Sequence, residues 1–344
     1  MSSRFVGGEF VFVTREKFER DLRRNTAKPG DLMYTQRGTL GQVSLVPTSP
    51  FDEYVISQSQ MRLRINTKAA DPRFVYYACR TSSFRKQVDD RAIATGVPHI
   101  NLGILAGLTI PDREPSEQRA IAEVLGALDD MIAANEKARQ VIDQLAGAEL
   151  KMASRSGVVV QRLGEIAEFL NRSRVPLSSR DREGRPGSVP YYGAAGRMDF
   201  VDSSIFDEEL VLVGEDGSVV RNDGRPVVQY VWGPAWVNNH AHVLRGKGIS
   251  LSLLRRLVER ANVHPLVTGA VQPKLSMGNL KSAEIPVPTC SQGLSESLTQ
   301  LDHILRALVE QNRALARTRD ELLPLLMSGR LRVRDAEQTA GEVL

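Results

Sequence analysis

Residues 294–329 read LSESLTQLDHILRALVEQNRALARTRDELLPLLMSG, which is the most regular pattern in the chain. Apolar side chains recur there at alternating steps of four and three residues, as they do along the seam of a coiled coil. This seam consists of Leu294, Leu298, Leu301, Leu305, Leu308, Asn312, Leu315, Arg319, Leu322 and Leu326. We expect the polar Asn312 to fix the register of the pairing at some cost in stability. Gly329 predicts the end of this helix.

A second long helix is predicted for residues 115–153. Pro115 suits its first turn, where a missing backbone N–H costs nothing. The seam of this helix consists of Ile121, Leu125, Leu128, Ile132, Asn135, Arg139, Ile142 and Ala146. We expect the two seams to pack on each other as an antiparallel coiled coil. The alternative is that each helix pairs with a different protein.

The composition indicates a folded chain long enough for two domains. Its 344 residues are 42% hydrophobic and 25% charged, which excludes a disordered chain. Cys79 and Cys290 are the only cysteines, so neither a disulfide framework nor a CxxC metal motif is present. No apolar run approaches the roughly 18 residues of a membrane span. The opening MSSRFVGGEF does not resemble a signal peptide, and a cytoplasmic protein is therefore expected.

The net charge of +4 conceals an alternation along the chain. Residues 1–114 carry a net charge of +5 and residues 154–292 carry +3, whereas residues 115–153 carry −3 and residues 293–344 carry −1. Basic blocks favour an anionic partner such as nucleic acid, and the acidic blocks coincide with the predicted helices. The alternative is chance, since these differences are small.

Both basic blocks are predicted to be α+β domains. The first contains short β-branched or alternating runs at 31–38, 41–46, 53–57 and 61–66, followed by a helix over 72–89. The second contains such runs at 163–169, 209–217, 226–233 and 241–246, followed by a helix over 251–262. In each block a glycine turn and a strand ending in Ile-Pro come next.

These similarities amount to an internal repeat. Four stretches recur in the same order at offsets of 173 to 179 residues: 31–39 with 209–218, 94–102 with 267–275, 109–111 with 284–286, and 128–129 with 301–302. The chain is therefore predicted to consist of a first domain (1–114), a central helix (115–153), a second domain (154–292), a distal helix (293–330) and a tail (331–344).

The repeated stretches resemble the specificity subunit of type I restriction–modification systems. The resemblance is carried by GDLMYTQRGTLG (30–41), TGVPHINLGILAGLTIPDREPSEQRAIAEVLGALDD (95–130), YYGAAGRMDFVDSSIFDEELVLVGEDGS (191–218) and LPLLMSGRLRV (323–333). Its most specific part is Ile110-Pro111, Pro115, Glu117-Gln118 and Ile121, which lead into the first helix.

The resemblance implies two target-recognition domains, separated by two long conserved helices, that each read one half of a split site in double-stranded DNA. It implies that the helices set the spacing and dock two DNA methyltransferase (M) subunits, that a nuclease–translocase (R) subunit can join, and that the chain is not itself an enzyme. It implies no cofactor, no metal and no membrane. The alternative is a helical adaptor or remnant that binds only the methyltransferase subunits.

The first domain departs from this pattern at its start. The second domain has about 50 residues between Leu163 and Glu209, whereas only about 29 residues precede Gly30 in the first. We therefore expect the first target-recognition domain to be shortened at its N-terminus by a strand or more.

Candidate DNA contacts are polar or basic residues beside strand ends and glycine turns, because Arg and Lys bind phosphates while Arg, Asn and Gln reach base edges. They are Gln36, Arg37, Gln58, Gln60, His99 and Asn101 in the first domain, and Arg172, Arg174, Arg221, Asn238, Asn239, His240 and Lys274 in the second. The alternative for each is a solvated loop position, and either His240 or His242 can face a core.

Enzymatic functions find little support. Walker A, HExxH and the Asn/Asp-Pro-Pro-aromatic motif of amino-methyltransferases are absent. Glu215, Asp216 and Asp223 could suggest a nuclease metal cluster, but GEDGS and RNDG are more typical of hairpin turns. Residues 89–91 and the pair Arg255-Arg256 are predicted to be solvated, and both cysteines to be inert.

Overall fold

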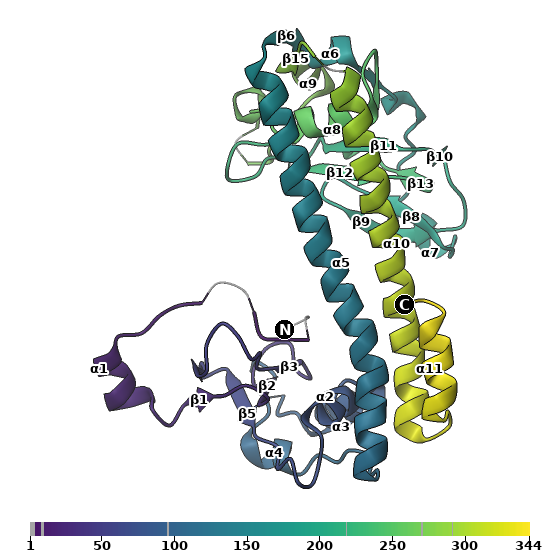
Figure 1. Ribbon diagram of the computed structural model, residues 1–344. Helices are drawn as coiled ribbons and strands as arrows, with labels where there is room; N and C mark the ends of the chain where they lie inside the picture. Colours follow the sequence, from purple (N-terminus) through teal and green to yellow (C-terminus); the bar gives the residue numbers. More distant parts are fainter. Residues whose placement is uncertain (1–3, 8–9, 95, 218, 270, 291) are drawn as a thin grey trace. The chain divides into compact units, whose positions relative to one another are not determined.

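The computed structural model in Figure 1 describes residues 4–7, 10–94, 96–217, 219–269, 271–290 and 292–344. The chain divides into two compact units. Unit 1 comprises Met1–Lys137 and Leu308–Leu344, and unit 2 comprises Ala138–Ala307. Thr95, Ser218 and Ala270, which belong to the repeated stretches, lie outside the described residues.

The two long helices form as predicted, and each contributes one segment to each unit. They are α5 (Pro115–Arg155) and α10 (Gln292–Ser328), and Gly329, with φ +72°, follows the end of α10. In unit 1 the segments run antiparallel, since Asp129 contacts Arg319 while Asn135 contacts Asn312.

The same orientation holds in unit 2. There the Ser297 hydroxyl donates to Glu149, 2.7 Å away. Further along, Arg256 lies between Asp143 of α5 and Asp302 of α10. The prediction of an antiparallel pair is therefore confirmed within each unit.

Unit 1 contains a small antiparallel sheet flanked by helices. The sheet order is β3 (Val43–Leu45), β2 (Leu32–Thr35) and β5 (Gln60–Leu63), and a separate pair joins β1 (Thr26–Ala27) to β4 (Tyr54–Val55). Its helices are α1 (Arg15–Lys17), continued by a π-helical turn at Phe18–Leu22, α2 (Pro72–Ala78), α3 (Ser82–Arg91), α4 (Leu102–Ala106) and α11 (Val333–Gly341).

One prediction for the helices of this unit was wrong. Residues 72–89 form two helices, because α2 ends at Cys79 and the Thr81 hydroxyl accepts from the Phe84 amide, which starts α3. The predicted tail contains α11, whose Ala336 and Ala340 are buried in the core of unit 1.

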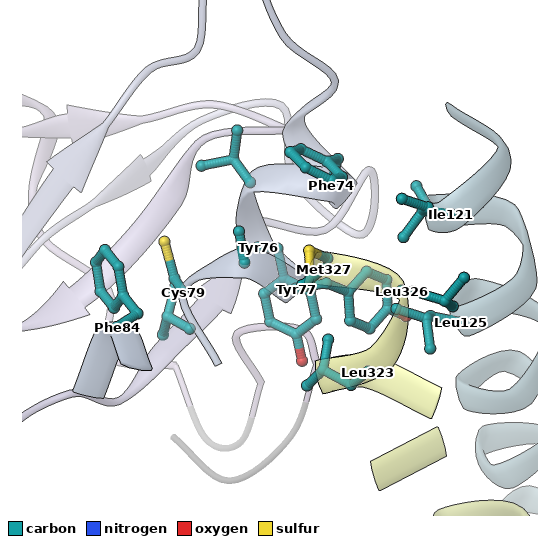
Figure 2. Close-up of a cluster of buried hydrophobic side chains, with 14 of the residues drawn as sticks. Phe74, Tyr76, Tyr77, Cys79, Phe84, Ile121, Leu125, Leu323, Leu326 and Met327 are labelled. Atoms are coloured by element: carbon teal, nitrogen blue, oxygen red, sulfur yellow. The ribbon is translucent and has the colours of Figure 1, made fainter. Parts of the chain in front are cut away.

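The core of unit 1 lies between α2 and the two long helices (Figure 2). Phe74 and Tyr77 of α2 pack with Ile121 and Leu125 of α5, and with Leu326 of α10. Tyr34 lies on the sheet side of the core, and its hydroxyl is 2.7 Å from the Cys79 sulfur. Burial raises the pKa of Cys79 to about 12 and keeps it a thiol, as expected of an inert cysteine.

Unit 2 contains two four-stranded sheets. The first has the order β12 (Val228–Val231), β11 (Leu210–Gly214), β14 (Ala241–Gly246) and β7 (Ala167–Phe169). The second has the order β10 (Phe206–Asp207), β13 (Pro234–Val237), β8 (Val189–Tyr192) and β9 (Arg197–Val201). A further pair joins β6 (Val158–Arg162) to β15 (Glu284–Pro288), and the helices are α6 (Leu163–Ile166), α7 (Ser179–Glu183), α8 (Leu251–Val258) and α9 (Met277–Lys281).

Strand β11 is buried on both faces because it lies between two layers. Val211 and Val213 pack against α8 and the long helices. Leu210 and Leu212 face the second sheet and pack with residues such as Val237. In unit 1 the equivalent residue, Met33 of β2, packs in a small cluster with Ala27 and Val46. Among the residues described in unit 1 there is no four-stranded sheet that covers this face of β2.

The repeat also breaks at the strand ending in Ile-Pro. In unit 2 it is β15, which pairs with β6 over five residues. In unit 1, Thr109–Pro111 is irregular, so the predicted strand was wrong there. Instead of a strand partner, the Gln87 side chain accepts from the Thr109 amide and donates to its carbonyl, both at 3.0 Å.

The prediction that Arg255 and Arg256 are solvated was also wrong. Both lie on α8 and are buried. Arg255 forms an ion pair with Asp302 of α10, whose side chain is 1% exposed, and Arg256 pairs with Asp143 of α5 at 2.7 Å. The two arginines can be buried because carboxylates of both long helices neutralise their charges. These ion pairs attach α8 to α5 and α10.

Replacing Arg255 by Met is expected to destabilise unit 2 by about 3 kcal/mol, because Asp302 would lose its closest cation while remaining buried. Urea unfolding followed by tryptophan fluorescence measures this unit alone, since both tryptophans, Trp232 and Trp236, lie in it. The matched control is Arg225→Met, which removes an exposed ion pair with Asp223. Equal losses in the two variants would contradict this assignment.

The amide pair in the seam gives a second prediction. Nδ2 of the buried Asn135 donates to Asn312 and to Gln311, both at 2.9 Å. Asn135→Leu should cost about 1–3 kcal/mol, because Asn312 loses its partner, whereas Asn135→Leu with Asn312→Leu should recover most of that loss. Urea unfolding followed by circular dichroism at the helix band measures both, and a double variant no more stable than the single one would show that the pair does not act as a unit.

Candidate nucleic-acid interface

In unit 2 most of the predicted contact residues gather where β11 ends and β14 begins, whereas Arg221 lies on the separate hairpin at 219–227. Gly214, the last residue of β11, pairs with Ala241, the first residue of β14. Directly after β11, Asp216 forms a bridge with Lys274. The loop at 171–174 joins them, because Arg174 donates to Glu215 at 2.7 Å. Four loops that are distant in sequence therefore form one surface.

Unit 1 has the same local geometry. Arg37 forms a bridge with His99, which in turn pairs with Ile93; in unit 2 the corresponding bridges join residues 216, 274 and 268. The amide of Ile100 donates to the Gln36 carbonyl at 3.0 Å. Its counterpart in unit 2 is the Leu275 amide, which donates to the Glu215 carbonyl at 2.9 Å. The repeat therefore places the same backbone frame at the candidate edge of each unit.

The turn at 57–60 belongs to this frame in unit 1. The Gln36 amide donates to the carbonyl of Ser59 at 2.7 Å, and Thr35 pairs with Gln60. Gln36, Arg37, Gln58 and His99 are thus brought to one edge of the sheet. The side chain of Gln60 accepts from the Ser57 amide, and that of Asn101 caps α4 by accepting from Ile104.

The two frames carry different side chains. At the bridged positions unit 1 presents Arg37 and His99, whereas unit 2 presents Asp216 and Lys274. The Lys274 ammonium is 3.3 Å from Asp216, and His240 Nδ1 is also 3.3 Å from that carboxylate. Equivalent positions with different hydrogen-bonding groups suit the recognition of different bases on a common scaffold.

Several candidates make contacts that shape these loops. Arg174 is largely buried and donates to the carbonyls of Asn171, Asn239 and Ala241 as well as to Glu215. The buried Asn238 accepts from the His240 amide at 2.8 Å and donates to the sulfur of Met198. In contrast, the side chains that face solvent are Arg37, Gln58, Arg172, Arg221, Asn239, His240 and Lys274.

His242 is the histidine that faces the core, and Asn171 holds it from one side. The Asn171 amide lies 2.9 Å from His242 Nδ1, and its oxygen accepts from the Val243 amide. Nε2 is 2.7 Å from the Leu275 carbonyl, which can only accept, so this nitrogen carries the hydrogen. Burial lowers the pKa of His242, which keeps the ring neutral.

Residues on the β8–β9 hairpin were not predicted as candidates. Gly193, Ala194, Ala195 and Gly196 form its tip, and Met198 follows at the start of β9. A shallow hollow of about 460 Å³ is lined by Ala194, Ala195, Gly196, Arg197 and Met198 of this hairpin, together with Asp216 and His240. The sequence contained the signal, a small-residue turn between two apolar runs, but small and apolar residues are not usual DNA candidates.

Two kinds of site are not found. Among the residues the structure describes, no three His, Cys, Asp or Glu side chains are grouped so that they could hold a metal ion. Glu215 and Asp216 instead pair with neighbouring cations, and Asp223 pairs with Arg225. None of the described helices is long and apolar enough to span a membrane.

Unit 2 is expected to lose stability as the pH falls below about 6.5, the usual pKa of histidine. The unfolded chain takes up a proton on His242 in that range while the folded unit resists it, so the unfolded state binds more protons. Urea midpoints at pH 7.5 and 5.5, followed by tryptophan fluorescence, measure the effect. His242→Gln should reduce the pH dependence and the exposed His264→Gln should not; the same pH dependence in all three proteins would exclude His242 as the cause.

Known proteins with similar sequences and folds support one family. The model of the type I restriction modification DNA specificity domain matches residues 7–144 and again residues 155–315. A type I restriction enzyme specificity subunit of Haemophilus influenzae is 33% identical over 142 residues, which is 41% of this chain and 36% of that one. The MjaIX specificity subunit of Methanocaldococcus jannaschii is 22% identical, over 95% of this chain and 85% of that one.

A solved structure agrees with the fold. The S subunit of a type I restriction–modification system from M. genitalium superposes with a TM-score of 0.57 at 21% identity, covering 87% of this chain and 83% of that one. The two family matches fall on the two copies of the repeat and together span most of the sequence. The chain belongs to the family of type I restriction–modification DNA specificity domains.

Proposed function

We propose that this chain is the DNA-recognition subunit of a type I restriction–modification complex and reads a split target through two domains. The proposed domains are residues 1–114 and 154–292, with helices at 115–153 and 293–330 and a tail at 331–344. The observation that carries the proposal is the loop frame present in both units, in which the bridge of Arg37 with His99 corresponds to that of Asp216 with Lys274.

The chemistry of the two frames suits DNA. Arg37, Arg172 and Arg221 are exposed and can bind phosphates or a guanine edge, while Gln58 and Asn239 can pair with adenine. Because the frame is held by backbone hydrogen bonds, the exposed side chains can differ between units without changing the fold. Such a scaffold allows each domain to read its own half-site.

The helices are proposed to set the spacing and to dock two methyltransferase subunits, with a nuclease–translocase subunit able to join. The full burial of Leu125, Leu128 and Leu315 supports a seam directed at the partner helix. Docking would therefore use other faces. Val141, Leu145 and Met152 form an exposed apolar stripe on α5 at steps of four and seven, which supports such a face.

The chain is proposed to be non-catalytic. Its described carboxylates at the loop edge are paired with cations, and the metal-dependent chemistry weighed for Glu215 and Asp216 gains no support from that pairing. The alternative, an adaptor that binds only methyltransferase subunits, is favoured by one observation: in the described part of unit 1, the two-stranded pair of β1 and β4 stands where unit 2 has a second four-stranded sheet.

The test is selection from a randomised duplex pool by the full chain with its methyltransferase subunits, at physiological salt. Two separated half-sites should be enriched. Arg37→Ala and Asn239→Ala should each weaken binding by about 1–3 kcal/mol and relax different half-sites, because the two residues belong to different units.

Arg317→Ala, which removes an exposed arginine of α10, is the matched control and should leave both half-sites unchanged. A salt titration separates base reading from phosphate binding. Added salt weakens phosphate contacts equally for all DNA sequences, whereas the preference for the selected half-site should remain. Enrichment of one half-site alone would restrict recognition to one unit. No enrichment, with the complex assembled, would support the adaptor and contradict DNA recognition.

A further inference from the structure

The hollow beside the β8–β9 hairpin of unit 2 combines an apolar floor with polar walls. Ala194, Ala195 and Met198 provide the apolar surface, and Met198 is 58% exposed. Asp216, His240 and the exposed Arg197 provide the polar side, and the His240 side chain is 49% exposed.

The hairpin is held in place by both sheets of its unit. Gln229 of β12, in the first sheet, donates to the carbonyls of Gly193 and Ala194, at 2.8 and 3.2 Å. On the other side, the buried Asn238 donates to the Met198 sulfur at 3.5 Å and accepts from the His240 amide. Asn238 therefore fixes the apolar and the polar side of the hollow relative to each other.

The hairpin tip is built for close approach. Its four residues are glycines and alanines, and the Gly193 amide closes the turn by donating to the Gly196 carbonyl at 2.9 Å. A Cβ at Gly193 would collide with the Met198 sulfur, so the glycine is required for the present position of Met198. Large side chains would keep a ligand away from this floor.

The charges around the hollow do not favour a phosphate inside it. The Asp216 carboxylate on its wall would repel an anion, and the nearby Lys274 is already paired with that carboxylate at 3.3 Å. Arg197, the cation on the lining, lies over the Phe200 ring, 4.4 Å from its centroid. An apolar floor beside one acceptor and one donor instead fits a base-pair edge that carries a methyl group. In the major groove of DNA the thymine C5-methyl is such a group, and it lies beside the hydrogen-bonding atoms of its A·T pair.

We propose that this hollow is a specificity-determining subsite for the C5-methyl group of a thymine, an inference that rests on the proposed DNA recognition. Met198 and Ala195 contact the methyl group. Asp216 and His240 face the polar atoms of the same edge, as acceptor and donor. Asn238 and Gln229 act as positioning residues, because they hold the walls and do not need to touch the DNA.

The test uses the full chain with its methyltransferase subunits and the duplex selected from a randomised pool. Each thymine of the selected half-sites is replaced in turn by deoxyuridine, which removes the methyl group alone. One position should lose affinity roughly fourfold, the equivalent of one buried methyl group. Met198→Ala should abolish that difference at this position, and Gly193→Ala should reduce it by displacing Met198.

Met277→Ala, which removes another exposed methionine, from α9 of the same unit, is the control and should keep the full deoxyuridine effect. Thermal unfolding by tryptophan fluorescence checks that each variant is folded. Placing 5-methylcytosine at each cytosine tests the other source of a C5-methyl group, and a gain of binding there that depends on Met198, with no effect of deoxyuridine, would overturn the assignment to thymine.

The outcomes separate the two proposals. Enriched half-sites without a deoxyuridine effect, or with an effect that Met198→Ala leaves unchanged, would overturn the methyl subsite while DNA recognition stands. Failure to enrich any half-site would overturn both. If Met198→Ala weakens binding equally for thymine and deoxyuridine, Met198 does not contact the C5-methyl group, and the methyl subsite is overturned.

Discussion

The structure depends on a buried aspartate that each long helix contributes at the same position of the repeat. In unit 1, Asp129 of α5 accepts from the Tyr77 hydroxyl of α2 at 2.8 Å and from Arg319 of α10 at 2.6 Å. In unit 2, Asp302 of α10 pairs with Arg255 of α8. A carboxylate in an apolar core is stable only when hydrogen-bonded or paired, so each aspartate binds a helix of its own domain to the long-helix pair.

This constraint leaves the sheets free to differ. Helix α2 and helix α8 both attach to the long helices, although their aspartate partners are a tyrosine in one case and an arginine in the other. Above that attachment, unit 2 carries a second sheet over Leu210 and Leu212, whereas the described part of unit 1 covers Met33 with a two-stranded pair. What the units share is the attachment and the loop frame, and it is this frame that would present side chains to DNA.

Features with a local cause could be predicted from the sequence. The long helices follow from a repeat of apolar residues, and the seam amides Asn135 and Asn312 were identified because they interrupt it. Arg255 and Arg256 were misjudged because the long-helix carboxylates that bury them, Asp302 and Asp143, lie more than 40 residues away in the chain. Their one local partner, Glu259, also fits a solvated helix end. The break after Cys79 was missed although the polar residues 80–83 mark it, and within them the Thr81 hydroxyl caps α3 by accepting from the Phe84 amide.

The candidate site also contains residues whose role the sequence could predict and residues whose role it could not. The candidates were chosen by residue type, as polar or basic side chains that can contact DNA. The same residue types also form hydrogen bonds within loops, so residue type alone does not separate the two roles. Arg174 and Asn238 hold the loops, whereas Arg172 and Asn239, their neighbours in sequence, face solvent. A change of target sequence should therefore retain the holding residues and vary the exposed ones, because a lost holding contact would move several loops together. The frame limits which positions can vary, and the residues presented at those positions determine what is read.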